Sequence, residues 1–260
     1  MKEARPRISA ATMQQFSSDG VRIAFIDEGE GDPILLIHGF ASNHGVNWVF
    51  PQWVKTLTGA GRRVIAMDSR GHGQSEKFYR PQDYAIALMA EDARRLLDHC
   101  GIARADVMAY SMGTRVAVVL ALTHPERVRA LVIGGMGDKL LSAGLGAEIA
   151  AAMEAPSADW LEDGPKMFRV FAEATRSDLK ALAACARGGR LKFSAQELNG
   201  LDLPVLIAVG TKDEVAGDPA RLAGMIPGAR VLAIPERDHN RSVGDTVFKK
   251  AVLAFLDARP

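Results

Sequence analysis

Three residues that each follow an apolar run could together perform nucleophilic catalysis: Ser111, Asp213 and His239. A serine hydroxyl is a poor nucleophile until a neighbouring imidazole removes its proton. The imidazole in turn needs a carboxylate that holds one tautomer and stabilises the developing positive charge. The order serine, acid, histidine is the chain order of hydrolases whose nucleophile sits on a sharp strand-to-helix turn. We therefore predict Ser111 as nucleophile, His239 as base and Asp213 as the orienting acid.

The residues around Ser111 read Ala109-Tyr110-Ser111-Met112-Gly113. A serine on such a turn has a strained backbone, and a large side chain two residues away would clash with the turn. The usual residue at the first small position is glycine, whereas Ala109 adds one methyl group. Because the requirement is smallness, we predict that the turn is kept. The alternative, a serine inside a buried helix, is disfavoured because the preceding residues have the pattern of a strand.

The elements that must position these residues alternate between short buried strands and longer helical periods. The expected strands are Val21–Gly29 (one arm of an edge hairpin), Pro33–Gly39, Arg63–Asp68, Asp106–Tyr110, Arg129–Gly135, Pro204–Gly210 and Arg230–Pro235. This alternation predicts an α/β fold with a mostly parallel sheet flanked by helices. Ligands bind outside the carboxyl ends of strands in such sheets, which is where the three catalytic candidates would meet.

One Ala-rich, helix-prone segment interrupts the alternation and contains no buried-strand run. We interpret residues 137–200 as a small helical cap inserted before the last two strands, and residues 1–136 and 201–260 as the core domain. The alternative is a set of extra helices packed beside the sheet. Candidate substrate-binding residues, from the cap and from the loops near the strand ends, are His44, Trp48, Met136, Trp160, Phe168 and Phe171.

The composition of the chain excludes several function classes. Hydrophobic residues make up 48% and charged residues 24% of the 260 residues, and the formal net charge is +1, so neither a nucleic acid nor an anionic membrane is an expected partner. Two cysteines are too few for a disulfide framework. No export signal or membrane-spanning run is visible, which favours a cytoplasmic protein. Metal-ligand spacings, a dinucleotide fingerprint and a Walker lysine are absent, so we expect no metal and no cofactor.

Four fragments in the correct order resemble the α/β-hydrolase superfamily. His38-Gly39-Phe40 is similar to the oxyanion loop of that family, and residues 68–75, DSRGHGQS, are similar to its D-x-R-G-x-G-x-S motif. The late GTKD and RDHN runs occupy the places of the triad acid and base. The resemblance covers nearly everything except the cap. It implies that the backbone N–H groups of Phe40 and Met112 form the oxyanion hole, and Ser111 excludes the epoxide hydrolases and haloalkane dehalogenases, which use aspartate there.

Other polar residues at the strand ends are weaker candidates. Asp138 is an alternative triad acid, whereas Asp238 is expected to be exposed to solvent. The resemblance implies structural roles for His38 and His72, and we assign Asp68 and Arg70 to a network that stabilises the loop.

The expected activity is hydrolysis of carboxylic esters of small, mainly neutral substrates through an acyl-enzyme, as in a carboxylesterase. The partners would be an ester and water. Enol-lactone hydrolysis, C–C bond hydrolysis and cofactor-free perhydrolysis use the same fold and triad and remain alternatives. A ligand receptor with a slow or vestigial triad is the alternative from a different class. The sequence does not specify the oligomeric state.

Overall fold

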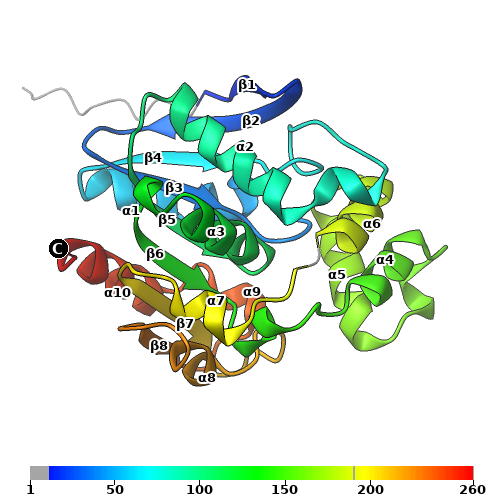
Figure 1. The fold of residues 1–260 in the computed structure, drawn as a ribbon. Helices are drawn as coiled ribbons and strands as arrows, with labels where there is room; N and C mark the ends of the chain where they lie inside the picture. The colour runs from blue at the N-terminus through cyan, green and yellow to red at the C-terminus, as the bar shows by residue number, and fades with distance from the viewer. Residues whose placement is uncertain (1–11, 190, 260) are drawn as a thin grey trace, which may run out of the picture.

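The computed structural model describes residues 12–189 and 191–259, and within them the strands form one eight-stranded sheet (Figure 1). Its order is β1-β2-β4-β3-β5-β6-β7-β8. The strands are β1 (Gln14–Ser18), β2 (Val21–Glu28), β3 (Asp32–Ile37), β4 (Arg62–Met67), β5 (Ala105–Tyr110), β6 (Val128–Gly134), β7 (Val205–Gly210) and β8 (Arg230–Ile234).

Only the β1–β2 and β2–β4 pairs of this sheet are antiparallel, and every pair from β4 through β8 is parallel. β5 and β7 are buried at every position, because helices cover both faces of the sheet and leave no side for polar residues. The predicted fold class, a mostly parallel α/β sheet flanked by helices, is confirmed.

Helices pack on both faces of the sheet. α2 (Ile86–His99), α3 (Met112–Thr123) and α8 (Pro219–Ala223) contribute to one apolar cluster, and α1 (Trp53–Gly59) and α10 (Thr246–Asp257) contribute to the other. The remaining short helical turns on the core are η1 (Gly45–Val49), η2 (Pro81–Tyr84), η3 (Pro125–Arg127) and α9 (His239–Ser242). No helix among the described residues is both long and apolar enough to cross a membrane.

Between β6 and β7 the described residues form helical elements and connecting segments. These elements are η4 (Asp138–Leu141), α4 (Gly146–Glu154), η5 (Ala158–Trp160), α5 (Asp163–Ala174), α6 (Leu179–Gly188) and α7 (Ala195–Asn199). α4, α5 and α6, which we call the cap helices, lie together beyond the end of the sheet toward which β6 and β7 point (Figure 1). They share a small apolar cluster with Ala41 of the loop after β3. Phe193 and Leu198, in contrast, pack in the cluster of the sheet.

Candidate active site

Ser111 lies at a sharp turn between β5 and α3. Its backbone has φ 50° and ψ −117°, a region that residues other than glycine rarely occupy. A Cβ atom at residue 113 would lie 2.5 Å from the carbonyl oxygen of Ile37 and 2.6 Å from that of His38, so only glycine fits there. Ala109, in contrast, is fully buried in β5, and the sheet accommodates its methyl group.

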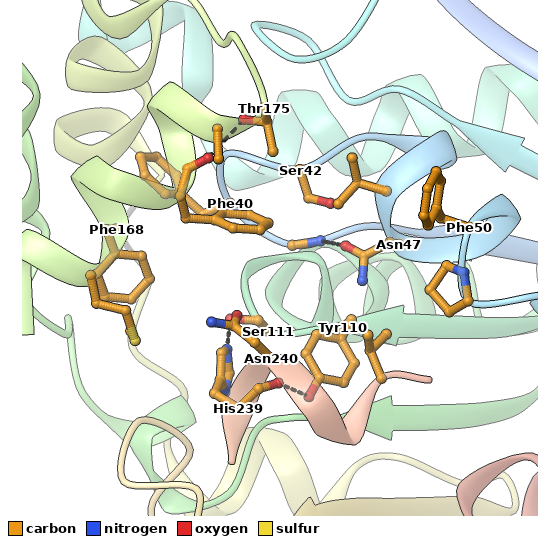
Figure 2. Close-up of a pocket in the computed structure, with 17 residues that line it drawn as sticks. Phe40, Ser42, Asn47, Phe50, Tyr110, Ser111, Phe168, Thr175, His239 and Asn240 are labelled. Carbon is orange, nitrogen blue, oxygen red and sulfur yellow. Dashed lines mark hydrogen bonds between the residues drawn. The ribbon is translucent and has the colours of Figure 1, made fainter. Parts of the chain in front are cut away.

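The side chains of Ser111, His239 and Asp213 form a hydrogen-bonded chain (Figure 2 shows the first two). His239 Nε2 lies 3.0 Å from Ser111 Oγ, and His239 Nδ1 lies 2.8 Å from Asp213 Oδ2. The Asp213 carboxylate is fully buried, and its second oxygen accepts the backbone N–H groups of Val215 and Ala216 at 2.9 and 3.0 Å. Because a carboxylate accepts at Nδ1, the proton of a neutral His239 is placed there and the Nε2 lone pair faces Ser111. This geometry allows the imidazole to remove the serine proton.

Tyr110 contacts both the backbone and the ring of His239. Its hydroxyl donates to the backbone carbonyl of His239 at 2.5 Å, and the two ring centroids are 5.5 Å apart. Sequence reasoning missed Tyr110, whose position directly before the nucleophile gave no sign of a contact with the other end of the chain.

The alternative acids have other partners. Asp138 accepts the backbone N–H of Asp218 at 2.9 Å and pairs with Arg221 at 3.0 Å. Asp238 caps the N-terminus of α9 by accepting the backbone N–H of Arg241. Of the acids considered, Asp213 is therefore the one that the structure brings to His239.

A buried polar network lies beneath the loop that follows β3. His38 Nδ1 is 2.7 Å from the carbonyl oxygen of Gly39, and its Nε2 accepts the N–H of Ser69 at 3.0 Å. The Asp68 carboxylate accepts both the backbone N–H and the ring of His44, each at 2.8 Å. Burial lowers the pKa of His38 and lowers that of His72 to about 3, so both rings are neutral at ordinary pH.

Arg70 lies at the edge of the same loops and is buried. Its guanidinium forms two hydrogen bonds with Asp92 of α2, at 2.7 and 2.8 Å, and one with the carbonyl of Asp83. This pair ties the loop after β4 to the helix layer, away from Ser111.

A cavity of about 490 Å³ opens above Ser111 and His239 (Figure 2). Among the described residues, its lining includes no Lys, Arg, Asp or Glu. Phe168 and Phe171 of α5 form its wall on the side of the cap helices, together with Met167.

The other predicted substrate-binding residues lie outside the cavity. Trp48 is completely buried in one apolar cluster and Met136 packs in the other. Trp160 is 75% exposed on η5. His44 is held by Asp68. Sequence reasoning missed Thr175, which lines the cavity and donates to the carbonyl of Ala41 at 2.9 Å, joining the end of α5 to the loop after β3.

The two predicted oxyanion donors belong to segments next to Ser111. Phe40 lines the cavity in the loop after β3, where a Cβ atom on the preceding Gly39 would be 3.3 Å from Ser111 Cβ. Met112 is the first residue of α3, where a helix leaves its N–H groups without intrahelical partners. The helix dipole also favours negative charge at this end.

The family model of the alpha/beta hydrolase fold matches residues 32–182. The chain belongs to this family. A solved α/β-hydrolase-like neighbour, a hydrolase from Pseudomonas aeruginosa, superimposes with a TM-score of 0.78 at 26% identity, covering 96% of this chain and all of that one.

Two curated relatives of this α/β hydrolase come from Pseudomonas putida. The dihydrolipoyllysine-residue acetyltransferase component of the acetoin cleaving system is 34% identical over 80% of this chain, which spans 59% of that protein. A 2-hydroxymuconate semialdehyde hydrolase is 40% identical over 50% of this chain and 45% of its own length. The matched regions therefore make up about half of each relative.

In residues 12–189 and 191–259 of this α/β hydrolase, no group of three or more His, Cys, Asp or Glu side chains is arranged to hold a metal ion.

Proposed function

We propose that this α/β hydrolase is a serine hydrolase that cleaves carboxylic esters of small, mainly neutral substrates through an acyl-enzyme. The observation that carries the proposal is the position of His239 between Ser111 Oγ, at 3.0 Å, and Asp213 Oδ2, at 2.8 Å, on the wall of an uncharged cavity.

In the first half-reaction, Ser111 Oγ attacks the ester carbonyl carbon while His239 Nε2 takes the hydroxyl proton. The negative charge on the tetrahedral oxygen is stabilised by the N–H groups of Phe40 and Met112. When the intermediate collapses, the bond to the alcohol oxygen breaks, His239 returns the proton to that oxygen, and the acyl group stays on Ser111. Asp213 stays ionised and stabilises the imidazolium throughout.

In the second half-reaction, His239 removes a proton from water, which attacks the acyl carbon. The bond to Ser111 Oγ then breaks, the serine regains its proton and the carboxylic acid leaves. Both steps need the same N–H donors and the same base, so no further residue has to be supplied.

The lining of the cavity supports a neutral substrate. Met167, Phe168 and Phe171 offer apolar surface to an acyl or alcohol chain, and no cationic side chain lines the cavity among the described residues. A carboxylate on the substrate would lose its hydration without gaining an ion pair, which disfavours charged esters.

A second candidate is hydrolysis of a C–C bond, and the 40% identity to a 2-hydroxymuconate semialdehyde hydrolase favours it. Enol-lactone hydrolysis and perhydrolysis would also use this triad. A receptor with slow turnover would differ from all of these enzymes because its acyl-serine would be hydrolysed much more slowly.

The test combines covalent labelling with turnover. We expect a fluorophosphonate probe to modify Ser111, located by peptide mass spectrometry, and p-nitrophenyl esters to be hydrolysed over many turnovers. Labelling followed by no more than one turnover per enzyme would favour a receptor. Failure to cleave any neutral ester, with cleavage of a C–C substrate, would favour the second candidate.

A further inference from the structure

Asn47 lies on the cavity wall opposite the cap helices, in the short π-helical turn η1. Its residue surface is only 6% exposed. Its backbone N–H is bound to the carbonyl of Asn43 at 3.0 Å, so the side chain starts from a fixed backbone. π-helical turns are rare and occur frequently at functional sites.

The orientation of the Asn47 amide is set by one hydrogen bond. The backbone N–H of Gly39 lies 2.9 Å from Oδ1, and an N–H group requires an acceptor. The amide oxygen must therefore face Gly39, and the NH₂ group must face the other way. Figure 2 shows this nitrogen on the side of the Asn47 amide away from the dashed hydrogen bond, toward Tyr110.

Within the part of the chain that the structure describes, the Asn47 side chain has one hydrogen bond, accepted by Oδ1 from Gly39, and its NH₂ group donates to no protein group. The cavity residues near it in the sequence are mostly apolar, with Val46, Phe50 and Pro51 on the same segment. When a substrate displaces water from this pocket, the Asn47 donor loses free energy unless the substrate supplies an acceptor.

We propose that Asn47 is a specificity residue whose Nδ2 donates a hydrogen bond to a neutral acceptor oxygen, a carbonyl or ether, of the substrate. The kinetic test of this inference rests on the proposed function, whereas its binding test does not. An acceptor is required because only N–H bonds point from this amide into the cavity. A carboxylate is disfavoured because, among the described residues, no cationic side chain lines the cavity to compensate its lost hydration.

The cavity therefore has two regions of different polarity, which we call its two arms. The arm beside Phe168 and Phe171 is apolar and suits a hydrocarbon chain, whereas the arm beside Asn47 suits a chain that carries an oxygen. Substrates that satisfy both arms have a polar neutral group on one side of the scissile ester and an alkyl group on the other.

The experiment compares esters that differ only by one oxygen in place of a methylene. One series is p-nitrophenyl hexanoate and its analogues with an ether oxygen at position 3, 4 or 5 of the acyl chain. The other is pentyl butyrate and 2-ethoxyethyl butyrate. One neutral hydrogen bond changes binding affinity by about three- to tenfold. We therefore expect kcat/KM for the ester with its oxygen at one position to exceed that of the methylene analogue by this factor.

The decisive variant is Asn47→Asp, which keeps an acceptor for Gly39 N–H and removes the donor. The oxygen-to-methylene ratio of kcat/KM should be about three- to tenfold lower in this variant than in the wild type. Alkoxy groups also change the intrinsic reactivity of an ester, so the measured quantity is the change in ratio between the wild type and Asn47→Asp. An Asn47→Leu variant, which lacks both functions, should in addition lower kcat for all esters. Equal ratios in the wild type and Asn47→Asp would show that Asn47 only positions Gly39.

A binding measurement separates this proposal from the proposed function. With Ser111→Ala, calorimetry should show that the best oxygen-containing chain, presented as a carboxamide, binds about three- to tenfold more tightly than hexanamide. Adding Asn47→Asp should remove the difference. Oxygen-dependent binding without ester turnover would overturn the proposed function and keep the subsite. Turnover without oxygen dependence at any position, or equal binding of both carboxamides, would overturn the subsite.

Discussion

At the proposed nucleophile, the positive φ of Ser111 places its hydroxyl beside His239, and among the described residues the Oγ atom has no other side-chain hydrogen bond that alanine would remove. Ser111→Ala should abolish fluorophosphonate labelling and lower kcat by about 10³-fold or more, leaving only the oxyanion donors and substrate binding. Steady-state kinetics and intact-protein mass spectrometry measure both effects. Near-normal turnover in this variant would show that another group is the nucleophile.

The two acids at the strand ends provide a matched pair of variants. Asp213→Asn removes the charge that stabilises the imidazolium and changes the tautomer of His239, so kcat should fall by about 10³- to 10⁴-fold. Asp138→Asn, whose carboxylate contacts Asp218 and Arg221 instead, should stay within about tenfold of wild type. The opposite ranking of the two kcat values would assign the acid to Asp138.

Sequence reasoning reached the polar residues of the site more readily than its apolar lining. Ser111, Asp213 and His239 were predictable because chemistry restricts the residue types and the strand ends restrict their places. Trp48 and Phe168 are both large apolar residues, yet the first is buried in the core and the second lines the cavity. Burial of apolar surface stabilises either kind of residue, so the residue type alone does not distinguish core packing from substrate binding.

Among the elements, α3 links Ser111 to the segments that lead to and from the cap helices. Arg115 of α3 is 7% exposed. Its guanidinium donates to the carbonyls of Lys139, Leu140 and Ser142 at 2.9, 3.1 and 2.9 Å, and also to that of Leu191. These carbonyls belong to the segment before α4 and the segment after α6, so one side chain holds both connections.

Arg115→Lys should loosen the cap helices, because an ammonium group cannot reproduce the several fixed N–H bonds of a guanidinium. We expect a loss of about 2 kcal/mol in unfolding free energy and a weaker dependence of kcat/KM on acyl length, with Ser111 still labelled. Urea unfolding and ester kinetics measure these effects. Arg187→Lys is the control, since Arg187 makes a half-exposed ion pair with Glu154 of α4 and should change stability by less than about 1 kcal/mol. Equal effects in the two variants would contradict the role of Arg115.

Seven of the eight described strands, β2 to β8, were predictable to within two residues because each combines apolar residues with a turn residue near its end. β1 (QQFSS) was not predicted, since it is short and mostly polar and only Phe16 and Ser18 in it are buried. The packing of the segment between β6 and β7 was harder to predict. Its composition is uniform and Ala-rich, yet Phe193 and Leu198 pack with the sheet while Met153 and Leu182 pack among the cap helices. The helical period shows which positions are apolar but not which surface they face.

The stability of the whole molecule should depend on the buried neutral imidazoles of His38 and His72. The pKa of His72 is lowered to about 3, from an unfolded value of about 6.5. The unfolded chain therefore binds the extra proton between these values, and stability is lost as the pH falls below about 6.5. At pH 5.5 this residue alone should cost about 1.4 kcal/mol relative to pH 7.5.

His72→Gln tests this expectation, because glutamine can still donate to the carbonyl of Arg70 but does not titrate. Unfolding free energies from urea denaturation at pH 7.5 and 5.5 should differ by about 1.4 kcal/mol less in the variant than in the wild type. An identical pH dependence in both proteins would mean that His72 does not remain neutral in the folded state.

At the scale of the whole molecule, the sheet and the cap helices enclose a cavity whose walls come from both, and its size should limit the substrate. Each methylene transferred from water to an apolar wall contributes about 0.8 kcal/mol, so kcat/KM should rise about fourfold per carbon until the cavity is full. p-Nitrophenyl acetate, butyrate, hexanoate and octanoate measure this rise, with a succinate monoester as the charged control. Phe168→Ala should flatten it, since this ring forms part of the wall beside α5. A strong preference for the succinate ester would contradict the uncharged cavity and point instead to a substrate that carries a carboxylate.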